Sequence, residues 1–221
     1  MTKYLETIKK SPLFQGISKE EIAVILDCLA AKSREYAKNE FVLRFGESAD
    51  AIGVVLAGSA HIIKEDFWGN RNIIAKIGPG QIFAESYACI PGAALGVSVA
   101  AAEPCAVMFM NVRRALATCG SACEFHSRLV RNLLSVLAEK NLLFNEKLTH
   151  MTQRTTRQKL LSYLSAESLR LGSPEFAIPF NRQQLADYLS VDRSAMSNEL
   201  SKMRDEGLLD FNKNHFRLLQ S

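Results

Sequence analysis

The chain lacks any long apolar run, and its charges nearly balance. Its longest apolar stretch, Ala93–Ala102, falls well short of the roughly 18 residues that a membrane helix needs. The N-terminal residues lack the apolar core of a signal peptide, and the five cysteines form an odd number, which argues against a secreted disulfide framework. We therefore expect a cytoplasmic protein without a membrane partner. The net charge of +4 says little by itself about nucleic acid.

Ligands for a catalytic metal are also scarce. His61 is the only histidine between Glu40 and Asn111, whereas a metal oxygenase built in a β-barrel needs about three converging ligands. No nucleophile elbow and no glycine-rich phosphate loop occurs. We therefore expect that the chain is not an enzyme.

The residues between Glu40 and Asn111 form short β-rich runs separated by glycine, with no long helical pattern among them. This texture predicts an antiparallel barrel or roll. Ser18 and Glu21 precede it in a capping-box pattern, which predicts a short helix that continues to about Leu29.

A long helix should follow, from about Val112 or Ser121 to Met151. Its apolar residues alternate by four and three, which is typical of a coiled-coil seam and predicts a homodimer. The expected dimer interface consists of Val130, Leu134, Leu137, Asn141, Phe144 and Leu148. A second stripe, Leu129, Leu133, Val136 and Leu143, is expected to pack on the helix's own domain. Asn141 is the polar residue of the seam, and it either fixes the register or faces a ligand.

Two short amphipathic segments, Arg182–Leu189 and Arg193–Met203, meet across a tight connection. In the second segment, Met196, Leu200 and Met203 share one face and leave polar residues outward. This spacing is typical of a DNA-reading helix-turn-helix. A hairpin with the turn Asn212–Asn214 follows and is expected to be a wing.

The outward residues of this motif are the candidate DNA contacts. Asn181, Arg182 and Gln183 are expected to bond phosphates and set the register. Arg193, Ser194 and Asn198 are expected to reach base edges, since Arg matches guanine and Asn matches adenine. Further phosphate contacts are expected from Ser197, Ser201 and Lys202.

The order of helix, roll, long helix and winged helix-turn-helix resembles the cyclic-AMP receptor / fumarate-nitrate regulator (Crp/Fnr) superfamily of bacterial transcription factors. Gly80–Ser86 resembles the phosphate-binding cassette of that superfamily, with Glu85 at the position of the glutamate that holds the ribose. The resemblance implies an α+β fold with a jelly-roll (double-stranded β-helix) sensor domain at residues 1–111. It further implies a dimerisation helix at 112–151 and a winged helix-turn-helix domain at 152–221. It implies a homodimer that binds palindromic promoter DNA and acts on RNA polymerase.

The chain departs from the cyclic-nucleotide-binding members of this superfamily. Leu95 and Gly96 stand where those members carry an Arg-Ser pair, and no Lys or Arg occurs between Lys76 and Arg113. A buried phosphate without a cation carries a large desolvation penalty, so the sequence argues against cyclic AMP as effector. Glu85 is then either a ligand contact or a turn carboxylate. The candidate effector pocket consists of Phe83, Glu85, Ser86, Leu95, Ser98 and Asn141.

Cys119, Cys123 and His126 would share one face of a continuous helix. Such a group suits zinc, haem iron or a redox pair, although the same residues also occur as apolar packing. Cys28, by contrast, is expected to be a small core residue.

Two functions remain open. In the first, the chain is a homodimeric DNA-binding regulator whose roll senses a small-molecule, haem/gas or redox signal. In the second, the roll is a binding module that controls a partner protein rather than a promoter.

Overall fold

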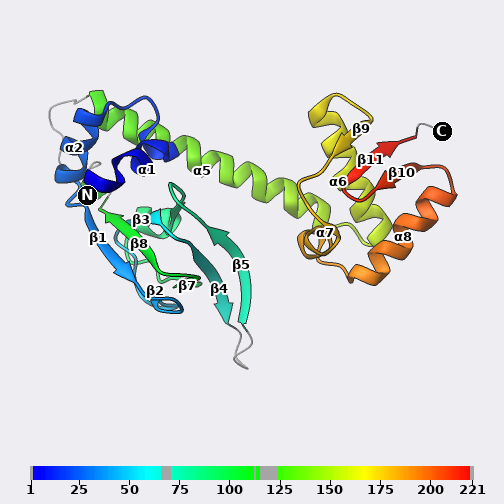
Figure 1. The fold of residues 1–221 in the computed structure, drawn as a ribbon, viewed down its shortest axis with the longest axis horizontal. Helices are drawn as coiled ribbons and strands as arrows, with labels where there is room; N and C mark the ends of the chain where they lie inside the picture. Colours follow the sequence, from blue (N-terminus) through cyan, green and yellow to red (C-terminus); the bar gives the residue numbers. More distant parts are fainter. Residues whose placement is uncertain (1, 66–70, 112, 115–123, 220–221) are drawn as a thin grey trace. The chain divides into compact units, whose positions relative to one another are not determined.

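The computed structural model describes residues 2–65, 71–111, 113–114 and 124–219. The chain divides into two compact units, Met1–Glu139 and Lys140–Ser221 (Figure 1). The long helix α5, Glu124–Met151, continues from the first unit into the second. Within the described ranges, no helix is both long and apolar enough to cross a membrane.

The first unit contains two four-stranded antiparallel sheets, with strand orders β1-β8-β3-β6 and β2-β7-β4-β5. This is the predicted jelly roll. Its strands are β1 Lys32–Tyr36, β2 Phe41–Leu43, β3 Ile52–Ala57, β4 Ala60–Glu65, β5 Arg71–Ile77, β6 Ile82–Phe83, β7 Ser98–Ala101 and β8 Cys105–Met110.

Short helices precede and interrupt the roll: η1 Thr2–Tyr4, α1 Leu5–Lys10, η2 Pro12–Phe14, α2 Lys19–Cys28 and α3 Glu85–Cys89. The capping box of α2 is confirmed. Ser18 Oγ accepts a hydrogen bond from the Glu21 amide at 3.2 Å, and Glu21 Oε2 accepts one from the Ser18 amide at 2.8 Å. The prediction for Cys28 was wrong: its side chain is exposed, because it lies on the outer face of α2.

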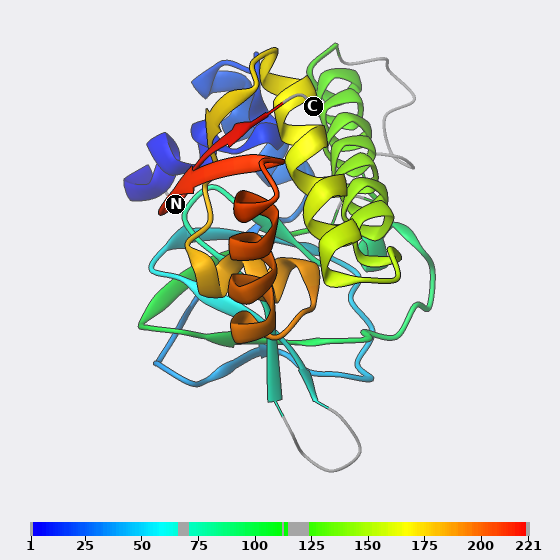
Figure 2. The ribbon, with the colours of Figure 1, turned by 90° about the vertical axis from the view of Figure 1, so that its right-hand side faces the viewer.

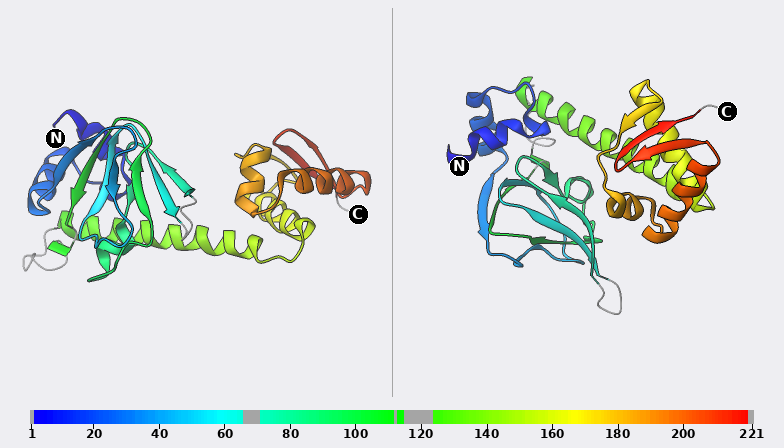
Figure 3. Two further views of the ribbon diagram at one scale, coloured as in Figure 1. Left: turned by 90° about the horizontal axis from the view of Figure 1, so that it is seen from below. Right: turned by 45° about the vertical axis from the view of Figure 1, so that its right-hand side comes forward.

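The first half of α5 is anchored to the N-terminal helices of its unit (Figure 3). Leu129, Leu133 and Val136 are buried in the core that they share with the N-terminal helices and the roll, as expected for the second stripe. Asn132 Nδ2 donates hydrogen bonds to the carbonyls of Leu13 and Gln15, both at 2.9 Å. These bonds fix the rotation of the helix about its own axis.

The second unit is built around one core of helices and a small sheet. Its elements are α6 Thr156–Leu171, β9 Glu175–Ala177, α7 Arg182–Leu189, α8 Arg193–Asp205, β10 Leu209–Asn212 and β11 His215–Leu218. The three strands form an antiparallel sheet in the order β10-β11-β9, and β10 and β11 are the predicted wing. Helix α8 packs against both α6 and α7, which sets the outer face of α8 (Figure 2).

Candidate nucleic-acid interface

Helix α8 separates its apolar and polar side chains cleanly. Met196, Leu200 and Met203 are fully buried, whereas Arg193 and Asn198 are exposed. Ser194, Ala195 and Lys202 are exposed as well. The helix begins at a side-chain cap, because Asp192 Oδ1 accepts a hydrogen bond from the Ala195 amide at 2.7 Å. The helix therefore presents a polar face that has the chemistry of base recognition.

Two of the expected phosphate contacts on α8 already use their hydroxyl protons. Ser197 Oγ donates to the Arg193 carbonyl at 2.9 Å, and Ser201 Oγ donates to the Ser197 carbonyl at 3.2 Å. A phosphate oxygen needs a donor, so each hydroxyl would have to exchange this bond to contact DNA. Exposed Lys202 needs no such exchange.

Arg157 on α6 holds α8 in place. Its guanidinium donates to Glu199 Oε1 at 2.5 Å and to both carboxylate oxygens of Glu206 at 2.7 and 2.8 Å. The hydrogen bond from Arg157 lowers the pKa of Glu206. A bidentate arginine fixes orientation as well as distance, so these bonds resist rotation of α8.

The turn between α7 and α8 contains a strained residue. Ser190 adopts the left-handed conformation, with φ 51° and ψ 59°. Lys159 Nζ donates to the carbonyls of Leu189 and Ser190 at 3.1 and 3.3 Å, which satisfies backbone oxygens at the end of α7. Lys159 was not predicted to have this role, since 30 residues separate it from the turn.

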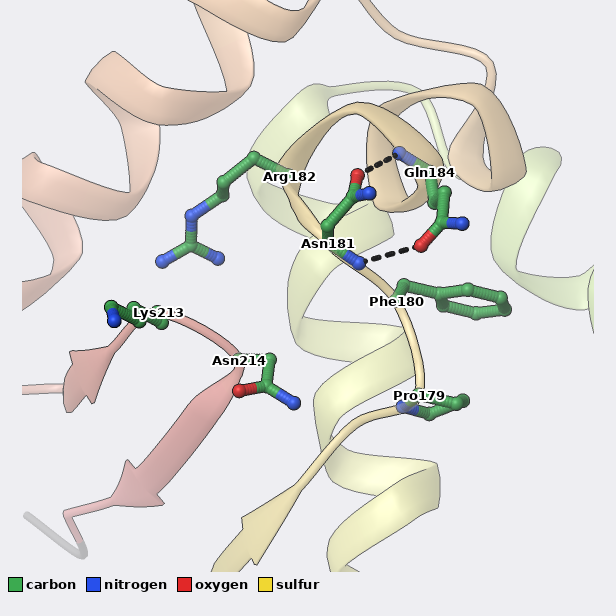
Figure 4. Close-up of a pocket in the computed structure, with 7 residues that line it drawn as sticks. All are labelled: Pro179, Phe180, Asn181, Arg182, Gln184, Lys213 and Asn214. Atoms are coloured by element: carbon green, nitrogen blue, oxygen red, sulfur yellow. Dashed lines mark hydrogen bonds between the residues drawn. The ribbon is translucent and has the colours of Figure 1, made fainter.

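The start of α7 is fixed by a reciprocal pair of hydrogen bonds (Figure 4). Asn181 Oδ1 accepts from the Gln184 amide at 2.9 Å, and Gln184 Oε1 accepts from the Asn181 amide at 2.8 Å. The Asn181 side chain thus acts as the helix cap. Gln183 is exposed, and its amide donates to Asp187 on the same helix.

Arg182 extends from α7 toward the wing (Figure 4). Its guanidinium carbon lies 4.6 Å from the ring centroid of Phe211 and 5.1 Å from that of Phe216, a cross-strand pair on β10 and β11. Burial among these rings lowers the pKa of Arg182. Neither phenylalanine was predicted as a site residue, although their alternation along the hairpin places them on one face.

A pocket of about 480 Å³ lies between the start of α7 and the turn of the wing. Arg182, Lys213 and Asn214 contribute polar groups to it, and Phe180 contributes an aromatic ring (Figure 4). Asn214 Nδ2 donates to the Ile178 carbonyl at 2.9 Å, which ties the wing turn to the segment before α7. The pocket therefore combines cations with fixed walls, which suits an anionic group.

Helix α5 carries large apolar side chains that its own chain leaves exposed. In the expected seam, Leu134, Phe144 and Leu148 are 61%, 67% and 48% exposed, and Val130 and Leu137 are half-buried. Asn141 is exposed, and its Oδ1 accepts from Asn145 Nδ2 at 2.8 Å. The expectation that Leu143 packs on its own domain was wrong. It is 64% exposed, because the core of the first unit extends along α5 only to Val136 and Leu137.

Comparison with known families matches both units. Residues 33–120 match the model of the cyclic nucleotide-binding domain, and residues 158–220 match that of the Crp-like helix-turn-helix domain. The cyclic AMP receptor protein of Thermus thermophilus is 24% identical over 208 residues, which cover 91% of this chain and 89% of that protein.

The chain is a homologue of the Crp/Fnr-family regulators.

Solved structures of related regulators have the same fold as this chain. The catabolite activator protein of Thermus thermophilus has a TM-score of 0.50 at 22% identity, covering 94% of this chain and 93% of that chain. The c-di-GMP responsive global regulator of Xanthomonas campestris has a TM-score of 0.54 at 19% identity, covering 90% of this chain and 100% of that chain. At these identities the structural likeness concerns the fold.

Most of the candidate effector residues in the cyclic nucleotide-binding domain are buried in the protein's own packing or bond to its own backbone. Phe83 is buried against Gly53, where an added Cβ would lie only 2.1 Å from the ring, and Leu95 is also buried. Ser98 Oγ accepts a hydrogen bond from the Phe45 amide at 3.0 Å. Glu85 is buried at the start of α3.

Two further candidate positions lie apart from these. Ser86 is exposed. Asn141 belongs to the second unit, so the structure does not place it relative to the roll.

Two side chains, Tyr87 and Arg113, bear on the missing Arg-Ser pair of the cyclic-nucleotide binders. The Gly96 amide donates to the Tyr87 hydroxyl at 3.2 Å, so Tyr87 bonds to the backbone where that pair would stand. The next cation along the chain, Arg113, donates to the carbonyls of Ala88 and Ile90 and pairs with Asp50 at 3.1 Å. Arg113 therefore already binds backbone carbonyls at the C-terminal end of α3.

Of the expected cysteine and histidine group, only His126 can be described, because Cys119 and Cys123 lie outside the described residues. His126 is buried near the start of α5, and its ring lies 4.8 Å from that of Phe125. No group of three metal-ligating side chains occurs within the described residues. Binding of zinc or haem at this position stays a prediction.

Proposed function

We propose that the protein is a homodimeric, sequence-specific DNA-binding transcription regulator. Helix α8 reads base edges in a major groove through Arg193, Ser194 and Asn198. The start of α7 and the wing contact the phosphate backbone. The roll senses a signal and changes the position of the two recognition helices, and RNA polymerase is the expected target of the bound dimer.

The observation that carries this proposal is the orientation of α8. Three fully buried side chains pin the helix, and Arg157 holds it from α6. Arg193 and Asn198 are exposed. Arg193 offers donors that match guanine O6 and N7, and Asn198 offers a donor for adenine N7 and an acceptor for adenine N6–H. Both residues lie in the first half of α8, where the recognition helix of a helix-turn-helix contacts base edges.

The proposed signal is not a cyclic nucleotide. Because Arg113 already bonds to the carbonyls of Ala88 and Ile90 and to Asp50, it is not free to supply the charge partner that burial of a cyclic phosphate demands. A small molecule of another class, a haem-bound gas or a redox change remains the proposed input. Some signal of this kind must favour one of two arrangements of the dimer.

Selection from random-sequence DNA tests the proposal. The full-length protein is incubated with a pool of random duplexes, and bound duplexes are recovered and sequenced over several rounds. We expect a palindromic consensus. The centres of its two half-sites should be separated by one turn of the DNA helix, about 10 base pairs, or by a whole number of such turns. The Arg193→Ala/Asn198→Ala double variant serves as control and should not enrich this consensus. Recovery of unrelated sequences by the wild-type protein would contradict the proposed function.

A further inference from the structure

Two guanidinium groups lie over the same aromatic ring of the wing, that of Phe211. The guanidinium carbon of Arg182 lies 4.6 Å from the Phe211 ring centroid, and that of Arg204 lies 5.1 Å from it. The two groups come from different helices, α7 and α8, so the ring joins both helices of the motif to β10. These distances place the two cations no more than about 10 Å apart.

No carboxylate among the described residues forms an ion pair with this cluster. Within the part of the chain that the structure describes, neither Arg182 nor Arg204 forms an ion pair, and neither does Lys213 at the wing turn. Arg182 is half-buried, and Lys213 lines the same pocket as Arg182. Cations that are brought together without an anion repel one another, so the arrangement favours an anionic ligand.

We infer that Phe211 is a positioning residue for DNA binding, whose ring holds Arg182 and Arg204 ready to contact the phosphate backbone as a pair. This inference rests on the proposed function, and it adds a residue that itself need not touch DNA. The face of an aromatic ring attracts a guanidinium group and restricts its rotation. An arginine held in this way loses less conformational freedom when a phosphate binds.

Phe211 suits this role better than its cross-strand neighbour Phe216. Phe216 is almost fully buried and belongs to the core of the second unit. Phe211 is only half-buried, and both arginines lie over it, so its ring faces the cationic surface. Replacing Phe211 therefore changes the arginines more than it changes the core.

The inference is tested with full-length protein and a fluorescent random-sequence duplex of about 30 base pairs, over a series of salt concentrations. The Phe211→Leu variant keeps the apolar bulk and removes the ring. We expect it to bind about threefold to tenfold more weakly and to lower the slope of log K against log salt by about one. The Phe211→Tyr variant keeps the ring and should retain the wild-type slope.

Two controls separate positioning from general damage. Phe180→Leu removes a ring from the same pocket, but no cation of the described residues lies over that ring, so the salt slope should not change. In an Arg182→Gln background, Phe211→Leu should weaken binding by less than it does in the wild type, because Phe211 would act partly through the missing arginine.

An unchanged slope for Phe211→Leu, or an equal loss in both backgrounds, would overturn the inference while leaving the proposed function intact. A wild-type protein that binds no duplex even at low salt would overturn both.

Discussion

Asn198 lies on the exposed face of α8, one turn after Arg193 and Ser194. In the superfamily that the sequence resembles, the best-known members carry Arg at this position and Glu at that of Ser194. A carboxamide pairs with adenine N6 and N7, whereas a guanidinium pairs with guanine. We therefore expect this chain to prefer a half-site that differs from theirs.

The Asn198→Ala variant tests this assignment. It should cost about 1–3 kcal/mol of binding free energy on the selected site and relax the choice of base at one position. Lys202→Ala, on the same exposed surface, should weaken binding to all sequences alike. Competition binding against a set of single-base variants measures both effects. A uniform loss from Asn198→Ala would refute its role in base readout.

Ser190 stores strain at the turn between α7 and α8, because it has a side chain and a φ of 51°. Glycine adopts this conformation freely, so Ser190→Gly should raise the free energy of unfolding by about 1 kcal/mol. Ser190→Ala keeps the strain and should bring no such gain. Urea denaturation followed by circular dichroism measures the difference, and equal midpoints for the two variants would contradict the explanation.

Side-chain roles were predictable where they depend on local pattern. The burial of Met196, Leu200 and Met203 follows from their helical spacing. The contact between Arg182 and Phe211 joins residues that are 29 positions apart in the sequence. Periodicity describes one element at a time, so it did not predict that contact.

The last turn of α5 contains a buried titratable ring. His150 is 3% exposed, its Nδ1 lies 2.8 Å from Ser162 Oγ, and its ring packs edge-on to that of Tyr163. Burial lowers the pKa of His150, although Glu146 and Glu167 act to raise it. The folded protein therefore holds His150 neutral to a lower pH than the unfolded chain does.

This shift makes stability depend on pH. Below about pH 6.5 the unfolded chain binds a proton at His150 more readily than the folded chain, so stability falls as the pH falls. The melting temperature should drop from about pH 7.5 to about pH 5.5, and it should drop less in His150→Gln, which cannot titrate but can still bond Ser162. Parallel curves for both proteins would show that other groups cause the effect.

The roll makes a separate prediction about ligands. Tyr87 and Arg113 are engaged with backbone groups around α3, so neither is available to a cyclic phosphate there. We expect no change in melting temperature with about 1 mM cyclic AMP or cyclic GMP, whereas a ligand at about 100 times its Kd would stabilise by about 2.7 kcal/mol. A saturable rise that Glu85→Gln abolishes would contradict this prediction.

Some helices and strands could be predicted from their own sequences, and others could not. Helix α7 begins and ends at the predicted residues, because a cap and an amphipathic pattern occur together in Asn181–Leu189. Strand β1 was not predicted, because four of its five side chains face solvent and no apolar alternation exists in Lys32–Tyr36. Its place in the roll comes from pairing with β8, which only the folded chain brings near.

In the molecule as a whole, one helix belongs to two units. The boundary between the compact units falls after Glu139, inside α5. The apolar seam of α5 crosses that boundary, with exposed Leu134 on one side and exposed Phe144 on the other. A partner helix along this seam would cover both, so dimerisation and the coupling of the two units would depend on the same surface.

The prediction for this surface is that single charges on it abolish the dimer. An exposed strip of Leu and Phe is costly in water, and burial contributes roughly 1.5–3 kcal/mol for each such side chain. Leu134→Asp and Phe144→Asp should each shift the protein to monomer in sedimentation velocity and weaken binding to a palindromic site. Ser135→Asp places the same charge on the same helix, at an exposed position one residue away from the seam, and should remain dimeric. If Ser135→Asp dissociates as readily as Phe144→Asp, the seam is not the interface. If neither seam variant dissociates, the two copies associate through another surface, and the exposed apolar residues of α5 need a different partner.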